Sequence, residues 1–234
     1  MQSFTEAFNL AATLLLEGNK ELLEIVFLSL KISTLSTVIG CIIGFPLGAI
    51  IVIYRFPGRR FTILMINTLM GLPPVVVGLV VYLLLSNAGP MGTFKLLYTQ
   101  IAMIIAQTIL ITPIVAALSR QVVESLYEEY EELFTSLLIT KASAIFALLW
   151  DARYSLLTIG LAGFGRAISE VGAVMIVGGN IAHVTRVMTT AIASETAKGD
   201  LALALALGMI LISITFLVNG CAMLLRGSKY FSNK

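Results

Sequence analysis

Charged residues are scarce in this sequence. Asp, Glu, Lys and Arg together make up 12% of its 234 residues, whereas 58% are hydrophobic, and the mean hydropathy is +0.98. Soluble globular domains carry about twice that share of charged residues. The composition therefore excludes an ordinary soluble protein and predicts an all-α, polytopic membrane protein.

Histidine, cysteine and the common catalytic motifs are rare or absent. The single histidine, His183, cannot belong to a histidine ligand set, and the two cysteines, Cys41 and Cys221, stand alone in apolar runs. The sequence has no GxxxxGK[ST], HExxH or GxSxG motif. We therefore expect no catalytic residue, no metal site and no ATPase activity in this chain. A net charge of +2 gives no indication of nucleic-acid binding.

Five apolar segments approach the length of about 20 residues that a helix needs to cross a bilayer. They cover residues 27 to 54, 61 to 86, 98 to 119, 152 to 177 and 201 to 225. The apolar run at residues 4 to 16 is shorter, so we expect an amphipathic helix at the membrane surface there. We also expect no removable signal peptide, and a single domain over residues 1 to 234.

Lysine and arginine predict the orientation of these spans, because cytoplasmic loops carry an excess of both. With the C-terminus inside, nine basic residues are cytoplasmic: Arg55, Arg59, Arg60, Arg120, Lys141, Arg153, Arg226, Lys229 and Lys234. Five are outside: Lys20, Lys31, Lys95, Arg186 and Lys198. Five spans and this imbalance predict an outer N-terminus and a cytoplasmic C-terminus.

Two features inside the predicted spans are unusual. Pro73 and Pro74 fall in the middle of the second span, where they remove backbone donors and force a kink. Arg166 and Glu170 lie in the outer half of the fourth span, and their spacing of four puts them on one helix face. Charges in a membrane normally find a partner and face the bundle interior or a water-filled path. A structural kink and a structural ion pair remain alternatives to pathway lining.

The stretch between the third and fourth spans is about 30 residues long and is predicted to be cytoplasmic. Its apolar part, residues 139 to 150, is too short to cross and is expected as a helix packed on or beside the bundle. Its acidic part is either a solvated face or a docking element for a cytoplasmic partner. The glutamates expected to face water are Glu124, Glu128, Glu129, Glu131 and Glu132.

Polar residues follow the fourth span at the predicted outer mouth: Asn180, His183, Thr185 and Arg186. For His183, a plain loop residue is favoured over a proton relay. Asp200 directly precedes the last span, where its carboxylate is placed to cap the helix.

Four segments, in the same order and at similar spacing, resemble permease subunits of type I ABC importers for oxyanions, in particular the molybdate and tungstate group. They are SLKIS (29 to 33), FPGRR (56 to 60), LPPVVVGLVVYLLLS (72 to 86) and RAISEVGAVMIVGGNIAHVTRVMTTAI (166 to 192). The wording of the last segment is most similar to tungstate permeases.

The acidic cytoplasmic stretch is similar to the EAA element of that family, which places a short coupling helix in a groove of the ATPase. Its acidic start falls on Glu131, and Glu132 and Leu133 stand where the family usually has alanines. Leu137 stands at the usual glycine and Asp151 at the usual proline. An alternative phase begins at Glu128 or Glu129. The resemblance implies that this stretch docks on an ATPase.

The resemblance implies an alternating-access importer in the plasma (inner) membrane of a prokaryote. A homodimer of this chain, surrounded by lipid, would bind two separate ATPase subunits that hold ATP and Mg, and an extracytoplasmic oxyanion-binding protein. Arg166 and Glu170 would form a switchable pair near an outer gate, together with Pro73, Pro74 and Ser169. Arg186 would attract a dianion at the mouth, or be a surface residue of the loop.

Tungstate is the substrate that the resemblance favours. A molybdate or sulfate importer stays open, as does a different class of protein, an ATP-independent oligomeric channel or carrier. A membrane scaffold without transport activity is the remaining alternative.

Overall fold

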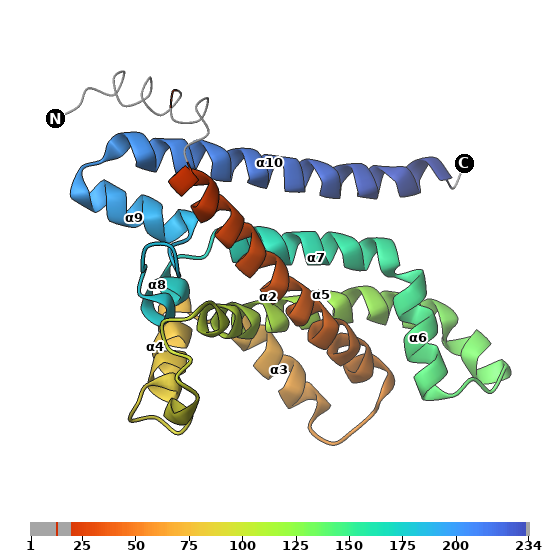
Figure 1. Cartoon of the computed structure of the whole chain (residues 1–234). Helices are drawn as coiled ribbons and strands as arrows, with labels where there is room; N and C mark the ends of the chain where they lie inside the picture. The colour runs from red at the N-terminus through yellow and green to blue at the C-terminus, as the bar shows by residue number, and fades with distance from the viewer. Residues whose placement is uncertain (1–12, 14–19, 233–234) are drawn as a thin grey trace. The chain divides into compact units, whose positions relative to one another are not determined.

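A computed structural model describes residue 13 and residues 20 to 232 of the chain, with side chains described up to Met223. Every regular element in this part of the chain is a helix, so the predicted all-α class is confirmed (Figure 1). The helices are α2 (Lys20–Ile53), α3 (Arg59–Met70), α4 (Pro74–Leu85), η1 (Gly92–Phe94), α5 (Gln100–Ser136), α6 (Lys141–Asp151), α7 (Arg153–Ile168), α8 (Gly172–Gly178), α9 (Met188–Lys198) and α10 (Leu201–Ser232). Apart from Thr13, the surface helix expected at residues 4 to 16 lies outside the described residues.

Three of the described helices, α2, α5 and α10, are long and apolar enough to cross a membrane alone. The number rises to five if two broken pairs, α3 with α4 and α6 with α7, each count as one span. The predicted kink at Pro73 and Pro74 is confirmed, because α3 ends at Met70 and α4 begins at Pro74. The predicted orientation of the spans stays a prediction.

The fourth span was predicted as one helix over residues 152 to 177, and this is wrong. Helix α7 ends at Ile168, and α8 begins at Gly172 after a break. At its other end, α7 meets α6 at an angle of 71°. The segment predicted as a single crossing is thus interrupted at residues 169 to 171.

The stretch that was predicted to be cytoplasmic begins within helix α5. Helix α5 does not end near Ser119 but continues through the acidic residues to Ser136. The span prediction depended on the apolar run, which ends where the polar residues begin. The helix itself continues through these polar residues. The predicted second helix is confirmed as α6, which follows a short turn and is capped where the Thr140 hydroxyl accepts a hydrogen bond from the Ser143 amide at 3.3 Å.

Residue contacts divide the chain into two compact units, each assembled from separate parts of the sequence. Within the described residues, the first unit holds 20 to 36, 73 to 107 and 165 to 218, and the second holds 37 to 72, 108 to 164 and 219 to 232. The single domain expected over residues 1 to 234 stays a prediction.

In the second unit, α2 and α5 pack closely along a line of glycines. Gly40, Gly44 and Gly48 recur every four residues on α2. A Cβ atom at Gly44 would lie 2.8 Å from a Val115 methyl carbon, and one at Gly48 would lie 2.8 Å from the Ala116 carbonyl oxygen. Only residues without a side chain allow this approach, as small residues do at many membrane helix interfaces.

Helix α6 packs on the same unit, as the sequence predicted. Its buried residues Ala144 and Leu148 join a cluster with Val52 and Ile53 of α2 and Val123 of α5. This packing fixes one face of α6 and leaves its other face exposed.

Glu124 does not face water freely, contrary to the prediction for this residue. Its carboxylate pairs with Arg120 one helical turn earlier and with Arg59 at 3.3 Å. Arg59 also donates from Nε to the Ile51 carbonyl at 2.6 Å. The glutamate is therefore part of a network that joins α2, α3 and α5.

In the first unit, α4 packs against α8. A Cβ atom at Gly78 would lie 2.8 Å from the Ala173 Cα atom, so the two helices touch backbone to backbone. The predicted cap of the last span is present, because the Asp200 carboxylate accepts a hydrogen bond from the Leu203 amide at 3.3 Å.

Candidate functional site

The charge pair that the sequence singled out lies at the break between Ile168 and Gly172, with Arg166 in the last turn of α7 and Glu170 inside the break. Arg166 Nη1 donates to Glu170 Oε2 at 2.5 Å, so the predicted contact is present. The two residues do not share one helix face, because α7 ends at Ile168 and Glu170 lies beyond it. The second carboxylate oxygen of Glu170 accepts a hydrogen bond from the Ala173 amide at 3.2 Å. One carboxylate therefore connects the last turn of α7 to the first turn of α8.

Side chains from two other helices bond to the backbone at this break, and a third helix supports one of them. Gln107 of α5 donates to the Ala167 carbonyl at 3.0 Å, and Thr189 of α9 donates to the Glu170 carbonyl at 2.7 Å. Ser36 of α2 in turn donates to the Gln107 side-chain oxygen at 2.7 Å. A broken helix leaves carbonyl and amide groups unpaired, which is costly away from water. These bonds let the chain be broken at this position.

Burial is unequal within the pair. The side chain of Glu170 is 4% exposed, whereas that of Arg166 is 37% exposed. The space beside Arg166 is open, since a Cβ atom at Gly165 would meet no atom within 4 Å, and Ser169 is exposed. The arginine therefore has an accessible side, while the carboxylate is enclosed and anchored. This geometry forms a charge pair in which the carboxylate is the enclosed partner.

The two prolines of the second predicted span lie at the start of α4. Pro73 occupies the position before the helix and Pro74 is its first residue, where a missing amide hydrogen costs nothing. The next residue, Val75, lies against α8, because a Cβ atom at Gly172 would meet a Val75 methyl carbon at 2.8 Å. The first turn of α4 thus adjoins the break that holds Arg166 and Glu170.

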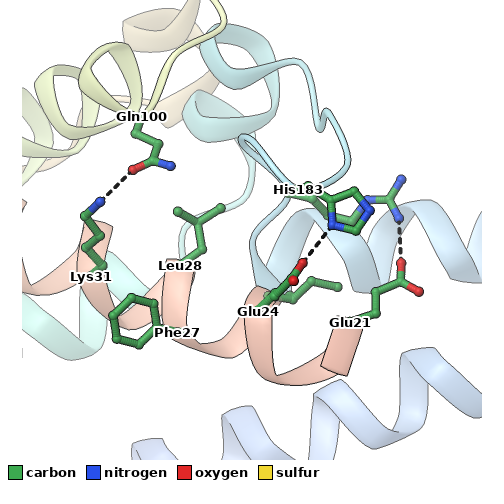
Figure 2. A pocket seen from close by; sticks show the side chains of 9 residues that line it. Glu21, Glu24, Phe27, Leu28, Lys31, Gln100 and His183 are labelled. Carbon is green, nitrogen blue, oxygen red and sulfur yellow. Dashed lines mark hydrogen bonds and ion pairs between the residues drawn. The ribbon is translucent and has the colours of Figure 1, made fainter. Parts of the chain in front are cut away.

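A cavity of about 450 Å³ opens between α2, the start of α5 and the loop after α8 (Figure 2). Lys31 donates to the Gln100 side-chain oxygen at 3.0 Å, and the Gln100 amide donates to the Val184 carbonyl at 3.2 Å. His183 lies 2.7 Å from a Glu24 carboxylate oxygen. The polar residues that line this cavity include Glu21, Glu24, Lys31, Gln100, His183 and Arg186.

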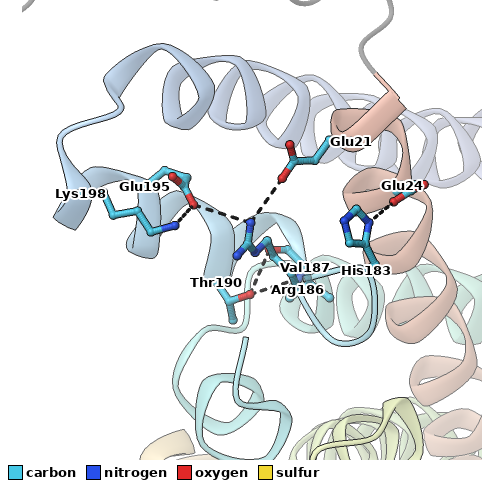
Figure 3. A network of polar contacts seen from close by, with 8 residues as sticks. All are labelled: Glu21, Glu24, His183, Arg186, Val187, Thr190, Glu195 and Lys198. Atoms are coloured by element: carbon cyan, nitrogen blue, oxygen red, sulfur yellow. Dashed lines mark hydrogen bonds and ion pairs between the residues drawn. The ribbon is translucent and has the colours of Figure 1, made fainter. Parts of the chain in front are cut away.

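Arg186 is the centre of a polar network beside this cavity (Figure 3). Its Nη1 atom lies 3.4 Å from Glu21 and 3.8 Å from the buried Glu195, which also accepts from Lys198 at 2.8 Å. The arginine side chain is only 16% exposed. Its charge is already shared between two carboxylates, and its role in attracting an anion stays a prediction.

Two other residues of the predicted outer mouth shape the loop itself. Thr185 is fully buried, and its hydroxyl donates to the Gly178 carbonyl at 2.6 Å and accepts from the Ile181 amide at 3.0 Å. Asn180 is half-buried and has a left-handed backbone, with φ of 50°. Both residues therefore help to set the backbone conformation of the loop between α8 and α9.

The residues predicted to contact an ATPase lie at the end of α5. All four glutamates are exposed: Glu128, Glu129, Glu131 and Glu132. Leu133 and Leu137 are 50% and 61% exposed, and Leu138 is 87% exposed. Leu138 also has a left-handed backbone, with φ of 51°, which is unfavourable for a branched residue. The tip of α5 therefore presents leucines beside acidic residues.

No family model matches the chain, but curated proteins do. This chain is 39% identical over 219 residues to the tungstate uptake system permease protein TupB of Peptoclostridium acidaminophilum. The aligned residues cover 94% of this chain and 96% of the Peptoclostridium protein. The TupB protein of Campylobacter jejuni is 37% identical over 92% of this chain and 90% of its own length. This chain belongs to the tungstate uptake permease family.

Other relatives of this permease carry broader or different names. The probable anion ABC transporter permease protein of Haloferax volcanii is 40% identical over 85% of this chain and 88% of its own length. Proteins named as sulfate transport permeases are more distant, at 24 to 28% identity. The relatives are transport subunits and not enzymes. This permease is accordingly an integral protein of the cytoplasmic membrane, in agreement with its membrane-crossing helices.

Several residues of the permease site were not found from the sequence. Gln107, Thr189 and Glu195 are polar, buried and bonded to segments far away in the chain. The signal that could have found Gln107 is an amide residue in the middle of an apolar span, because such a residue needs a partner in a membrane. Thr189 carries no comparable signal.

Proposed function

We propose that this chain is the membrane-spanning subunit of an ATP-driven importer for tungstate. The observation that carries the proposal is the 39% identity to the Peptoclostridium tungstate permease over nearly the full length of both chains. Substrate would pass from an extracytoplasmic binding protein to the cytoplasm by alternating access. In that mechanism the partners supply the energy through their different affinities for two conformations, so the permease needs movable joints and no catalytic groups.

The proposed assembly is a homodimer of this chain, embedded in lipid, with two ATPase subunits and the binding protein. The sequence has no P-loop, so ATP and Mg would bind the separate subunits. Up to five spans from one chain are few to enclose a path for a solute, and a second copy is the simplest way to complete it.

The ATPase would contact the tip of α5. The exposure of Leu133, Leu137 and Leu138 supports this proposal, because large exposed apolar groups at a polar surface mark interaction sites. The surrounding set is Glu128, Glu129, Glu131 and Glu132, which would set the orientation of the contact.

The break between α7 and α8 would act as the gate. Glu170 is held by the Ala173 amide independently of Arg166, so the pair can separate without releasing the carboxylate. Ser169, Pro73 and Pro74 would move with this joint, and Asn180, Thr185 and Arg186 would form the mouth beyond it. A charge-swapped Arg166→Glu, Glu170→Arg chain should regain part of the uptake that each single change loses. A double variant as inactive as both single variants would argue against a switchable pair.

Cellular metal content tests the function. Cells with and without this chain would be compared by elemental mass spectrometry for tungsten and molybdenum at low external tungstate and molybdate, with and without excess sulfate. Loss of tungsten uptake that survives excess molybdate and sulfate supports the proposal. Equal loss of both metals indicates a shared molybdate and tungstate importer, and competition by sulfate indicates a sulfate importer.

The same cells separate an importer from a channel or carrier. If tungsten uptake continues when the proposed partner ATPase is deleted, the ATP-driven class is contradicted, and an ATP-independent oligomeric channel or carrier is favoured. Unchanged content of both metals would overturn oxyanion transport altogether.

A further inference from the structure

A small enclosed cavity lies beside the break between α7 and α8. Its volume is about 10 Å³, and cavities of roughly 10–15 Å³ are large enough for one water molecule. All nine residues that line it are at most 6% exposed. They come from α2, α5, the end of α7, the break itself and the start of α9. The cavity is therefore interior, and it lies within the first compact unit of the chain.

Polar side chains form more than half of the cavity wall. The polar lining residues are Ser29, Ser33, Gln107, Glu170 and Thr189. Cavities that stay dry in proteins have apolar walls, whereas a polar cavity that offers two to four hydrogen-bond partners holds water. The composition of the wall thus favours a bound water molecule.

Other ligands fit this cavity poorly. A tetrahedral oxyanion carries four oxygen atoms and exceeds the volume of one water molecule, and the Glu170 carboxylate would repel it. The charge of Glu170 is already balanced by Arg166. In the described part of the chain, no group of three or more histidine, cysteine or acidic residues could hold a metal ion.

Glu170 has acceptor capacity left for such a water molecule. One carboxylate oxygen accepts from Arg166 Nη1 and the other accepts from the Ala173 amide. A carboxylate offers about four acceptor positions, so about two of them remain. These positions belong to a side chain that is 4% exposed, where bulk water does not satisfy them.

Gln107 and Thr189 can also bond to a water molecule. One N–H of the Gln107 amide donates to the Ala167 carbonyl, and the side-chain amide has a second N–H. The Thr189 hydroxyl donates to the Glu170 carbonyl, and its oxygen can still accept. Together with Glu170, these side chains offer one donor and two acceptors, which is the number of partners that a buried water molecule typically has.

We propose that this cavity binds one water molecule, which accepts a hydrogen bond from Gln107 and donates to Glu170 and Thr189. The water would join α5, the break and α9 at one point. Its presence is inferred from the cavity alone, whereas its role in transport rests on the proposed gate. In that gate, the water would keep Glu170 hydrogen-bonded while Arg166 moves away, which lowers the free-energy cost of separating the pair.

Radiolytic hydroxyl-radical labelling of the full chain in lipid nanodiscs tests the site, because radiolysis of a bound water forms a radical beside the residues that surround it. Mass spectrometry then measures the oxidation of each residue. Val187 and Ile168 line the cavity, whereas Val174 and Ile111 are also buried but do not line it. We expect Val187 to be oxidised several-fold faster than Val174, and Ile168 several-fold faster than Ile111. Equal rates within both pairs would overturn the proposal.

A radical scavenger in the bulk solution separates bound water from bulk water. Leu138, which is 87% exposed, reports on radicals that form in the bulk. We expect the oxidation of Val187 and Ile168 to persist at scavenger concentrations that suppress the oxidation of Leu138 several-fold. A parallel loss at all three residues would show that the radicals arrive from outside, and the bound water would be refuted.

Ser33→Thr probes the cavity directly, because it keeps the hydroxyl and adds a methyl group at the cavity wall. We expect the oxidation of Val187 and Ile168 to fall several-fold. Ser213→Thr is the matched control, since it makes the same change at an exposed serine that bonds only within its own turn of α10, and it should alter neither rate. Unchanged oxidation in a folded Ser33→Thr chain would count against the site.

These measurements use neither tungstate nor the ATPase. A negative labelling result would therefore refute the water site and leave the proposed importer function standing. A failed uptake experiment would remove the transport role and leave the water site standing.

Discussion

At its first residue, helix α7 carries an arginine whose guanidinium lies over two exposed rings, whereas in its last turn Arg166 contacts a carboxylate that is 4% exposed. The two arginines belong to one helix and each stands near a break. Their partners differ: Trp150 and Tyr154 are open to the surroundings, and Glu170 is enclosed. We therefore expect the burial of the partner, and not the type of the residue, to decide how much each arginine contributes to the stability of the fold.

The backbone shows the same contrast. At the α6–α7 corner the chain satisfies itself, because the Ala152 amide donates to the Leu148 carbonyl at 2.8 Å and the Leu156 amide donates to the Ala152 carbonyl at 2.9 Å. At the α7–α8 break the Glu170 amide donates to the Ala167 carbonyl at 3.2 Å, and Gln107 and Thr189 from other helices add hydrogen bonds to the Ala167 and Glu170 carbonyls. In this chain the α6–α7 bend therefore uses backbone hydrogen bonds between residues close in sequence, whereas the α7–α8 break also uses side chains of α5 and α9.

The largest expected effect comes from removing Arg166. Arg166→Ala leaves the buried Glu170 carboxylate without its counter-charge, so we expect a loss of about 3 kcal/mol in unfolding free energy, the low end for such pairs because Arg166 is partly exposed. Arg153→Ala, the matched control, should change stability by less than about 0.5 kcal/mol. Thermal unfolding in detergent measures both. Equal losses in the two variants would remove the distinction between the ends of α7.

Gln107→Leu should have the next largest effect. The Ala167 carbonyl and the Ser36 hydroxyl lose a partner in a buried place, which costs about 1–3 kcal/mol. Gln100→Leu provides the control, because that glutamine lies at the edge of the open cavity and should lose less. A Gln107 variant as stable as the Gln100 variant would show that the break does not depend on α5.

Glu170→Gln should destabilise less than Arg166→Ala. The amide still accepts from the Ala173 amide, and the charge left alone is the partly exposed arginine, so about 1–2 kcal/mol is expected. The comparison is made in the same unfolding experiment. If the glutamine variant is the less stable of the two, the buried carboxylate is not the group that makes the pair costly to break.

Thr189→Val should have the smallest of these effects. The substitution keeps the shape and removes one hydroxyl donor from the Glu170 carbonyl, which should cost about 1 kcal/mol. Thr62→Val is a fair control, because the Thr62 hydroxyl is exposed and bonds only to the Gly58 carbonyl of its own turn. Identical stability of the two variants would mean that α9 does not support the break.

The sequence predicted the helical class, the kink at Pro73 and Pro74, the contact of Arg166 with Glu170 and the packing of α6. These depend on composition or on residues close together in the chain. The interruption after Ile168 was not predicted, because the segment ISEV contains no proline or glycine and the partners of the break lie on α5 and α9. The continuation of α5 to Ser136 was not predicted, because hydropathy alone does not distinguish a polar helix end from a loop.

One pattern was visible in the sequence and was overlooked. Gly40, Gly44 and Gly48 have the four-residue spacing that favours close helix contact in membranes, and the structure uses all three against α5. The burial of Thr189 and Glu195, by contrast, could not be predicted from the sequence, because it depends on tertiary packing alone.

The most direct test of the account is the initial rate of ATP-driven tungsten uptake into proteoliposomes that contain the full complex, compared between the Arg166→Ala and Arg153→Ala chains in the same lipid. The account predicts at least about a tenfold loss for Arg166→Ala, equivalent to about 1.4 kcal/mol, and a loss of less than about twofold for Arg153→Ala. Similar rates for the two variants would contradict it.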